Sequence, residues 1–135
     1  MFPFEFVIAG PPLSLQTRNR QRYQAWKDAV RGAAAARWPA TLAPTSESVK
    51  IRITYYYDRN SPDVDNIIKP IQDALNGLIY VDDRQVIETT SRRRRRDRSF
   101  RISVMSPVLA AGIEQDVEFL HVEVVLAGNA EEAGG

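Results

Sequence analysis

Five aspartates fall within residues 61–86, and their spacing suggests metal chemistry: Asp63, Asp65, Asp73, Asp82 and Asp83. In an extended segment, side chains two residues apart leave the backbone on one side, roughly 6 to 7 Å apart. Asp63 and Asp65 can therefore converge on one small cation of the kind that carboxylates bind. A turn followed by a helix cap explains the same pair equally well, so both interpretations stay open for the pair alone.

The residues after this pair have the periodicity of an amphipathic helix. One stripe is apolar and would pack on a core: Ile67, Ile71, Leu75 and Leu78. Asp65, Lys69 and Asp73 recur at i, i+4 and i+8 on nearly the opposite side, which gives the helix a charged face. On spacing alone, a surface ion pair with one of these aspartates explains Lys69 more readily than a catalytic role does.

The start of this helix has two candidates. Asp65 can cap it, because an aspartate side chain accepts the unpaired N–H groups of the first turn. Pro70 conflicts with that start, since a proline inside a helix removes a hydrogen bond and can cost up to about 3 kcal/mol. If Lys69 is the cap instead, Pro70 becomes the first helical residue, a position that proline favours.

The chain after this helix would return to the same place. Asn76-Gly77 is a helix stop signal, and the apolar run of residues 78–81 predicts a short strand. That strand would bring Asp82 and Asp83 close to the acids that precede the helix. Carboxylates gathered at one sheet edge repel one another unless a cation offsets their charge, so the metal interpretation gains weight over the cap.

Size and composition predict one globular domain. The chain has no cysteine and one histidine, which excludes disulfides, thiolate zinc sites and a histidine-rich metal site built from one chain. That histidine, His121, lies in an apolar run and is expected to be structural, as are Trp26 and Trp38. No apolar run is long enough for a membrane span and the N-terminus lacks a basic signal region, so we expect no membrane contact and a cytoplasmic location.

The net charge of +1 hides strongly basic and acidic segments. Residues 18–37 carry six bases and one acid, and residues 92–101 carry seven arginines and one aspartate. Residues 114–135 contain six acids and no lysine or arginine. Fifteen of the 18 bases are arginine, whose guanidinium suits bidentate contact with phosphates.

Five consecutive arginines, Arg92 to Arg96, have two explanations. They could blunt the edge of a sheet or form a targeting patch. Phosphate binding is favoured, because an acidic metal site needs bases nearby to admit a polyanion. On an extended strand, Arg92, Arg94 and Arg96 would lie on one side, with Arg93 and Arg95 on the other.

Other parts of the chain show strand or helix periodicity. Strands are predicted at residues 2–9, 49–57, 86–96, 99–105 and 116–126, the fourth as the antiparallel partner of the third. A helix is predicted from about residue 19 to residue 38, and residues 106–115 would form a loop or short helix. We expect residues 1–127 to form the domain and residues 128–135 to be a disordered tail.

Residues 62–86 resemble the signature of RusA-like Holliday junction resolvases. The arrangement D-x-D-N-x-x-K, D-A-L and D-D-x-Q-V occurs here in order and at near-identical spacing. Outside this stretch the likeness is looser. Residues 17–22, the five-arginine run and residues 104–126 depart from the family pattern, which bears on substrate preference more than on chemistry.

The resemblance implies a single-domain α/β (α+β) protein with a small mixed β-sheet and two main helices packed on it. It implies a homodimer that uses Mg²⁺, which Mn²⁺ would replace, to nick branched DNA at four-way junctions. Asp63, Asp65 and Asp83 match the family's catalytic, metal-binding carboxylates, and Lys69 matches its catalytic lysine. Asp73 and Asp82 match further acids of the motif, which would be secondary metal ligands.

Nucleic-acid contacts are expected from arginines of the two basic segments: Arg18, Arg20, Arg22, Arg92, Arg93, Arg94, Arg95 and Arg96. Two other functions stay open. One is a nuclease of the same fold that acts on other DNA or RNA, as in phage or defence contexts. The other is a non-catalytic nucleic-acid-binding module whose acids only cap helices.

Overall fold

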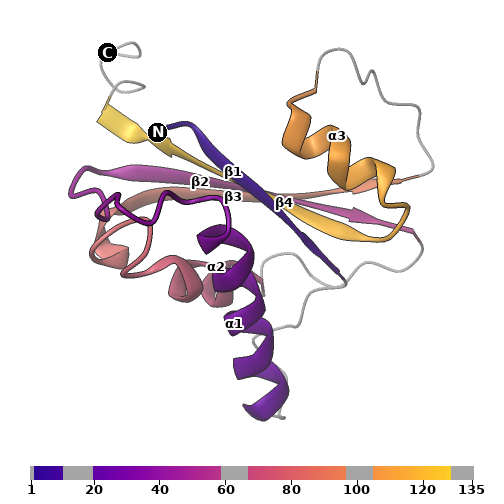
Figure 1. Ribbon diagram of the computed structural model, residues 1–135, viewed down its shortest axis with the longest axis horizontal. Helices are drawn as coiled ribbons and strands as arrows, with labels where there is room; N and C mark the ends of the chain where they lie inside the picture. The colour runs from indigo at the N-terminus through magenta and orange to yellow at the C-terminus, as the bar shows by residue number, and fades with distance from the viewer. Residues whose placement is uncertain (1, 11–19, 59–66, 97–104, 129–135) are drawn as a thin grey trace.

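The computed structural model describes residues 2–10, 20–58, 67–96 and 105–128. Within these ranges the chain forms one α+β unit (Figure 1). Its elements are β1 (Phe4–Ala9), α1 (Arg20–Ala35), β2 (Val49–Tyr57), α2 (Ile68–Leu75), the 3₁₀-helix η2 (Asp83–Gln85), β3 (Val86–Arg95), α3 (Pro107–Glu114) and β4 (Phe119–Leu126). The predicted fold class, a small mixed sheet carrying two main helices, is confirmed.

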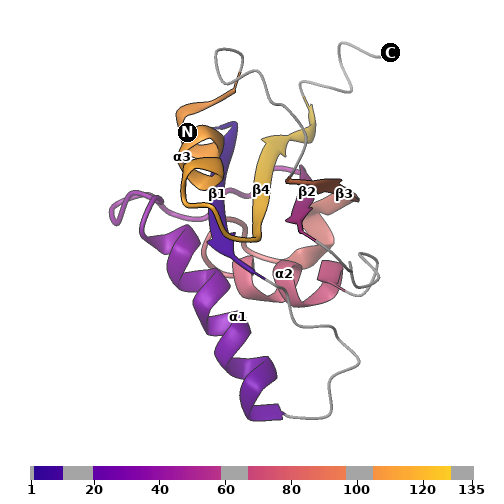
Figure 2. The same cartoon turned by 90° about the vertical axis from the view of Figure 1, so that its right-hand side faces the viewer.

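The strands form one mixed sheet in the order β1-β4-β2-β3. β4 is antiparallel to both β1 and β2, whereas β3 runs parallel to β2. A parallel pair needs a crossover connection, and α2 supplies it on the sheet face that α1 also covers (Figures 1 and 2). Among the described strands, β3 therefore lies at an edge of the sheet, directly after the loop that carries Asp82 and Asp83.

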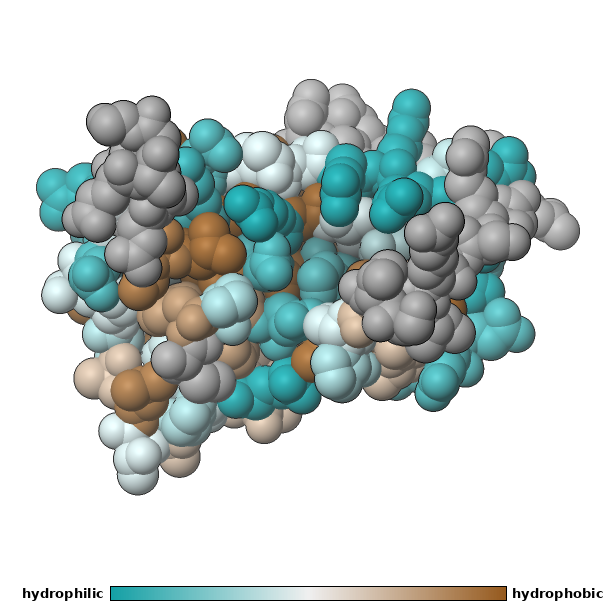
Figure 3. All heavy atoms as spheres, turned by 90° about the horizontal axis from the view of Figure 1, so that it is seen from above, coloured by the Kyte–Doolittle hydropathy of each residue, from teal (hydrophilic) through white to brown (hydrophobic). Residues whose placement is uncertain are grey.

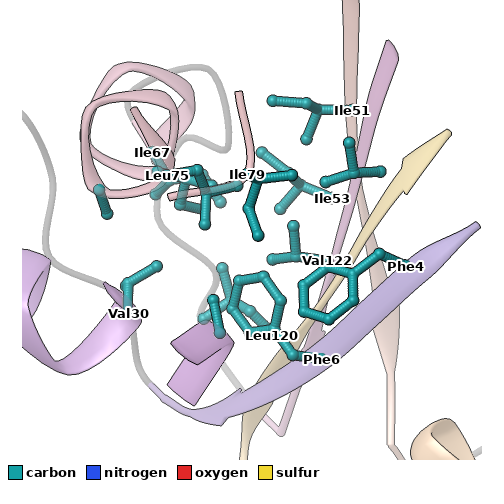
Figure 4. Close-up of a cluster of buried hydrophobic side chains, with 14 of the residues drawn as sticks. Phe4, Phe6, Val30, Ile51, Ile53, Ile67, Leu75, Ile79, Leu120 and Val122 are labelled. Carbon is teal, nitrogen blue, oxygen red and sulfur yellow. The ribbon is translucent and has the colours of Figure 1, made fainter. Parts of the chain in front are cut away.

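The main core lies between the sheet and the helices α1 and α2. Alternate strand positions supply one side of it and the apolar stripes of the helices supply the other. Figure 4 shows this packing for Phe4, Phe6, Val30, Ile51, Ile53, Ile67, Leu75, Ile79, Leu120 and Val122. Trp26 and Trp38 belong to the same core, as predicted. Because the stripe of α2 is buried, its charged face points away from the core.

The start of α2 lies between the two predicted starts. Ile67 occupies the N-cap position without a side-chain hydrogen bond, so the predicted cap at Lys69 is wrong, and the other candidate, Asp65, lies outside the described residues. Pro70 is the third helical residue, where a backbone N–H would have no intrahelical partner in any case. The proline therefore removes no helical hydrogen bond, and its ring is buried.

Residues 78–81 form a turn, so the predicted short strand is wrong. Gly77 ends the helix as predicted, with φ of +83°, and its N–H donates to the carbonyl of Tyr80 at 2.7 Å. Ile79 and Tyr80 are fully buried in the core, which accounts for the apolar character that resembled a strand. Leu78, the fourth predicted member of the helical stripe, lies past the end of α2 and is half-buried.

The second face of the sheet is partly covered by α3, the helix that forms within residues 106–115 (Figure 2). The contact is close, because a Cβ added at Gly112 would lie 2.9 Å from the ring of Phe119 on β4. Residues 99–104 of the predicted partner strand and residues 129–135 of the predicted tail lie outside the described ranges, so both stay predictions. None of the described helices is long and apolar enough to cross a membrane.

The positive φ of Gly77 generates a stability prediction. An alanine in this left-handed conformation costs roughly 1 to 2 kcal/mol, so Gly77→Ala should lower the free energy of unfolding by about that amount. Gly77→Asn is the matched control, because asparagine tolerates the same conformation better. Urea unfolding followed by circular dichroism measures both variants. An alanine variant no less stable than the asparagine variant would contradict the backbone explanation.

Candidate active site

Lys69 lies between two aspartates that come from different elements. Its Nζ atom is 2.8 Å from Asp73 Oδ1, one turn further along α2, and 3.6 Å from Asp83 Oδ2 at the start of η2. The first contact is the i, i+4 pair expected from sequence, whereas the second exists only because the fold brings the loop back to α2. The hydrogen bond to Asp73, and more weakly the charge of Asp83, raise the pKa of Lys69. Lys69 is therefore a cationic hydrogen-bond donor at the junction of α2 and η2.

Asp82 and Asp83 are adjacent in sequence but differ in their contacts. Asp82 is the N-cap of η2, and its Oδ1 accepts the backbone N–H of Arg84 at 2.9 Å. The same carboxylate pairs with the Arg84 guanidinium, and these contacts, the backbone one first, lower the pKa of Asp82. Asp83 instead directs a side chain that is 36% exposed toward Lys69. Asp83 is thus the acid of this pair that faces the cluster.

Gln85 holds the loop before η2 with four side-chain hydrogen bonds. Its Oε1 accepts the backbone N–H groups of Val81 and Asp82, both at 2.9 Å. Its Nε2 donates to the carbonyls of Thr45 and Glu47, both at 2.8 Å. The motif D-D-x-Q-V contained this glutamine, but sequence reasoning gave it no role. Its anchoring partners are backbone carbonyls 38 and 40 residues earlier, and only the folded chain reveals them.

A buried tyrosine joins α2 to the same loop. The hydroxyl of Tyr80 donates to the carbonyl of Gln72 at 2.6 Å, and the Gln72 side chain donates to Thr89 of β3 at 2.8 Å. Burial, followed by the charges of Asp83 and Asp73, raises the pKa of Tyr80, so the phenol stays protonated and able to donate. These bonds fix α2 relative to β3, and with it the position of Lys69 relative to the loop.

Asp63 and Asp65 lie in residues 59–66, outside the described part of the chain. Within the described ranges, no group of three or more acids or histidines is placed to hold a metal ion. The segment 59–66 ends directly before Ile67, which begins the turn of α2 that carries Lys69. Carboxylate oxygens are the ligands that Mg²⁺ prefers, so Asp83 together with these two aspartates is a chemically suitable donor set.

The other end of segment 59–66 is anchored by a polar cluster. Glu118 accepts the hydroxyl of Tyr55 and the backbone N–H of Asp58, both at 2.7 Å. Arg96, whose side chain is only 14% exposed, pairs with Asp58 at 2.8 Å and with Asp116 at 2.9 Å. Arg96 therefore fixes the point from which the acidic segment leaves the sheet. Its position at the end of an arginine run gave no sign of this structural role.

The arginine run is divided between the two faces of the sheet, as its alternation predicted. Arg92 is paired with Thr54 in the β2–β3 register, and its Nε donates to Thr54 Oγ1 at 3.1 Å on the face away from α2. Side chains alternate along a strand, so Arg94 shares that face, whereas Arg93 and Arg95 lie on the face of α2. Only the second pair is on the side of Lys69.

The first turn of α1 lies near the charged face of α2. α1 and α2 pack against each other, and burial, followed by the charge of Asp73, raises the pKa of Tyr23 in α1. Arg20 and Arg22 precede Tyr23 and are exposed. Arg18 lies outside the described residues. The contacts of these three arginines with nucleic acid stay predictions.

Acids and a lysine gathered next to a basic edge strand define a candidate nuclease site, because the bases can attract the phosphates that such a site would cleave. A family model described as Endodeoxyribonuclease RusA matches residues 9–105, more than half of the chain. The chain therefore belongs to the RusA endodeoxyribonuclease family, which confirms the resemblance seen in residues 62–86. The match includes Lys69, the loop with Asp83, and the arginine run. No curated protein matches the chain.

The bonds of Gln85 generate a prediction for stability and activity together. Gln85→Ala leaves two N–H groups and two carbonyls without their partner, so it should lower the free energy of unfolding by about 2 to 3 kcal/mol. It should also slow DNA cleavage, since Asp83 would no longer have a fixed position. Gln24→Ala is the control, because Gln24 is exposed and bonds only to Asp28 in the described structure. Urea unfolding and single-turnover cleavage measure both effects. A Gln85→Ala protein that matches the control in both would show that the Gln85 side chain does not hold the loop in place.

Proposed function

We propose that this chain is a magnesium-dependent, structure-selective endodeoxyribonuclease that resolves four-way DNA junctions by paired nicks. The supporting observation is the approach of Asp83 to Lys69, two residues that α2 and a turn separate in the chain. Asp63 and Asp65 precede α2 by a few residues in the chain, outside the described part of the structure. A single site built from these four residues needs this arrangement, and membership of the RusA family supports the nuclease assignment.

In this proposal Asp63, Asp65 and Asp83 hold Mg²⁺, with Mn²⁺ as a substitute. When bound, the metal supplies a Lewis acid for the scissile phosphate and an activated water. Lys69 donates an N–H to a phosphate oxygen and offsets the charge that develops there. Asp73 supports the site through its 2.8 Å contact, which orients the Lys69 ammonium.

Arginines on the same side as Lys69 would guide DNA to the site. Arg93 and Arg95 lie on the α2 face of β3, and Arg20 and Arg22 lie on the neighbouring helix α1. Their contacts would be with phosphates, which position a duplex without reading its sequence. We place Arg18, which precedes α1, in the same group.

The dimer follows from the reaction. Resolving a junction requires two nicks related by a two-fold axis, and the motif with Asp63, Asp65 and Asp83 occurs once in the sequence, so we propose a homodimer. The apolar residues of the late strands are our candidates for its interface. The cytoplasmic location expected from sequence stays a prediction.

The carboxylates generate the prediction that tests this function. Asp63→Asn, Asp65→Asn and Asp83→Asn should each abolish Mg²⁺-dependent cleavage of a four-way junction and retain junction binding, because the acids hold the metal and the arginines hold the DNA. Electrophoresis of a labelled panel of junctions, flaps, duplexes and RNA measures the products. Cutting by Asp63→Asn at the parental rate would defeat the metal assignment. A wild-type protein that prefers flaps, duplexes or RNA to junctions would instead identify a nuclease of the same fold with another substrate.

The dimer has a separate test. Light scattering at the concentrations that support paired nicking should give twice the mass of the chain, and paired nicks should appear together within one binding event on a cruciform plasmid. A monomeric mass at those concentrations would count against the dimer, whatever the cleavage result.

The arginine run generates a prediction about binding. Replacing Arg93, Arg94 and Arg95 together by alanine should weaken binding to all junction sequences alike. The slope of log affinity against log salt should flatten by roughly 0.9 for each phosphate on the duplex arms that the protein no longer neutralises. Fluorescence anisotropy across salt concentrations measures this slope. An unaltered slope with greater aggregation would favour the other explanation, in which the arginines only blunt the edge of the sheet.

A further inference from the structure

The face of the sheet opposite α1 and α2 has an open region over β2 and β3. α3 packs on β1 and β4, and Figure 3, which views this side, shows hydrophilic side chains across its centre and along one edge. A groove of about 440 Å³ lies in this region. It is lined by Arg52, Ile53, Thr54, Thr90, Arg92 and Glu123, and we refer to it as the outer groove.

Two rows of cross-strand neighbours build the outer groove. Glu123, Arg52 and Thr90 form one row across β4, β2 and β3, and Thr54 and Arg92 extend the next row to the edge. Neighbouring strands are about 4.8 Å apart and successive same-face residues about 6.7 Å apart, so these side chains meet around one hollow. Their polar ends come from three strands of a rigid sheet rather than from a loop.

Among the described residues, each guanidinium group in the outer groove makes one side-chain hydrogen bond, which leaves N–H donors for another ligand. Arg52 Nη1 lies 3.2 Å from Glu123 Oε1, while the Arg52 side chain remains 60% exposed. Arg92 is oriented through its Nε by Thr54, which is itself buried. An arginine carries five N–H donors, so the outward edges of both groups can bind an oxyanion.

The charge around the outer groove is positive. The bases on this part of the face are Lys50, Arg52, Arg92 and Arg94, and the acids are Glu88, Glu123 and the neighbour of Glu123 on β1, Glu5. Apolar lining, which a second protein surface would favour, is limited to Ile53. Polar donors and excess positive charge instead match a phosphate backbone.

We propose that the outer groove binds the sugar-phosphate backbone of duplex DNA as a second contact surface, on the opposite side of the sheet from Lys69. The proposal rests on the DNA substrate of the proposed function but not on cleavage. Among the described strands β3 lies at the edge of the sheet, so the backbone of one arm can lie against Arg93 and Arg95 while that of another lies against Arg52 and Arg92. Two arms of a branched molecule would then be held on either side of one strand.

The test compares DNA affinities in Ca²⁺ without Mg²⁺, so that binding is measured apart from cutting. Arg52→Ala combined with Arg92→Ala should weaken binding to a four-way junction about tenfold. It should also flatten the salt slope by roughly 1.8, which is 0.9 for each of the two phosphates that these arginines would neutralise. Arg52→Lys with Arg92→Lys is the matched control and should keep most of the slope. Glu123→Gln should tighten binding several-fold, because it removes an acid and releases Arg52.

Three outcomes would contradict DNA binding by the outer groove. The double alanine variant could have the same DNA affinity and salt slope as the lysine control, or Glu123→Gln could leave the DNA affinity unchanged. The affinity of the double alanine variant could also fall only in step with dissociation of the dimer, measured by sedimentation. If the Thr54 bond matters for folding, Arg52→Ala alone still tests the groove, since the side-chain hydrogen bond of Arg52 in the described structure is to Glu123. If the wild-type protein binds junctions through this groove but does not cut them, the proposed function is refuted while DNA binding by the groove is supported.

Discussion

Like charges held at close range are the constraint on which this site depends. Asp73 and Asp83 both approach Lys69, within 2.8 and 3.6 Å of its ammonium group, although carboxylates that share one site repel one another. The lysine offsets part of that repulsion, and the remaining charge favours a cation. Asp82 adds less to the local charge on the cluster because its carboxylate is engaged with Arg84.

The surrounding fold holds these groups together against their repulsion. The buried stripe of α2 fixes the helix that carries Lys69, and Gln85 fixes the loop that carries Asp83. Tyr80 connects the two through its bond to Gln72. At the far end of segment 59–66, Arg96 and Glu118 hold Asp58, so both ends of the acidic segment are attached to rigid structure. A metal site requires such rigid supports to keep its ligands in place.

Periodicity predicted most of the fold. Alternation located β1, β2 and β4, and helical spacing located α1 and α2, because each buries one face on a common core. β3 was predicted as an extended segment, although none of its residues is fully buried. The errors arose where tertiary burial replaced local signals: Ile79 and Tyr80 are buried in a turn rather than a strand, and Pro70 fits the first turn of a helix whose N-cap residue, Ile67, makes no side-chain hydrogen bond. The motif predicted the site residues, and of these the described structure brings Lys69, Asp73 and Asp83 together. The roles of Gln85, Arg96 and Glu118 were not predicted, since each acts through partners distant in the chain.

The central claim is that Asp83 and Lys69 belong to one magnesium site, and thermal unfolding in the presence of the metal tests it most directly. Ligand binding to the native state stabilises it, by about 2.7 kcal/mol at one hundred times the dissociation constant. We predict that Mg²⁺ raises the melting temperature of the wild type in a saturable way and leaves Asp83→Asn unchanged. Asp82→Asn, one residue away, should keep the response from a lower starting stability. A wild type that melts at the same temperature in Mg²⁺ and in chelator, or an Asp83→Asn protein with the full wild-type shift, would contradict the claim.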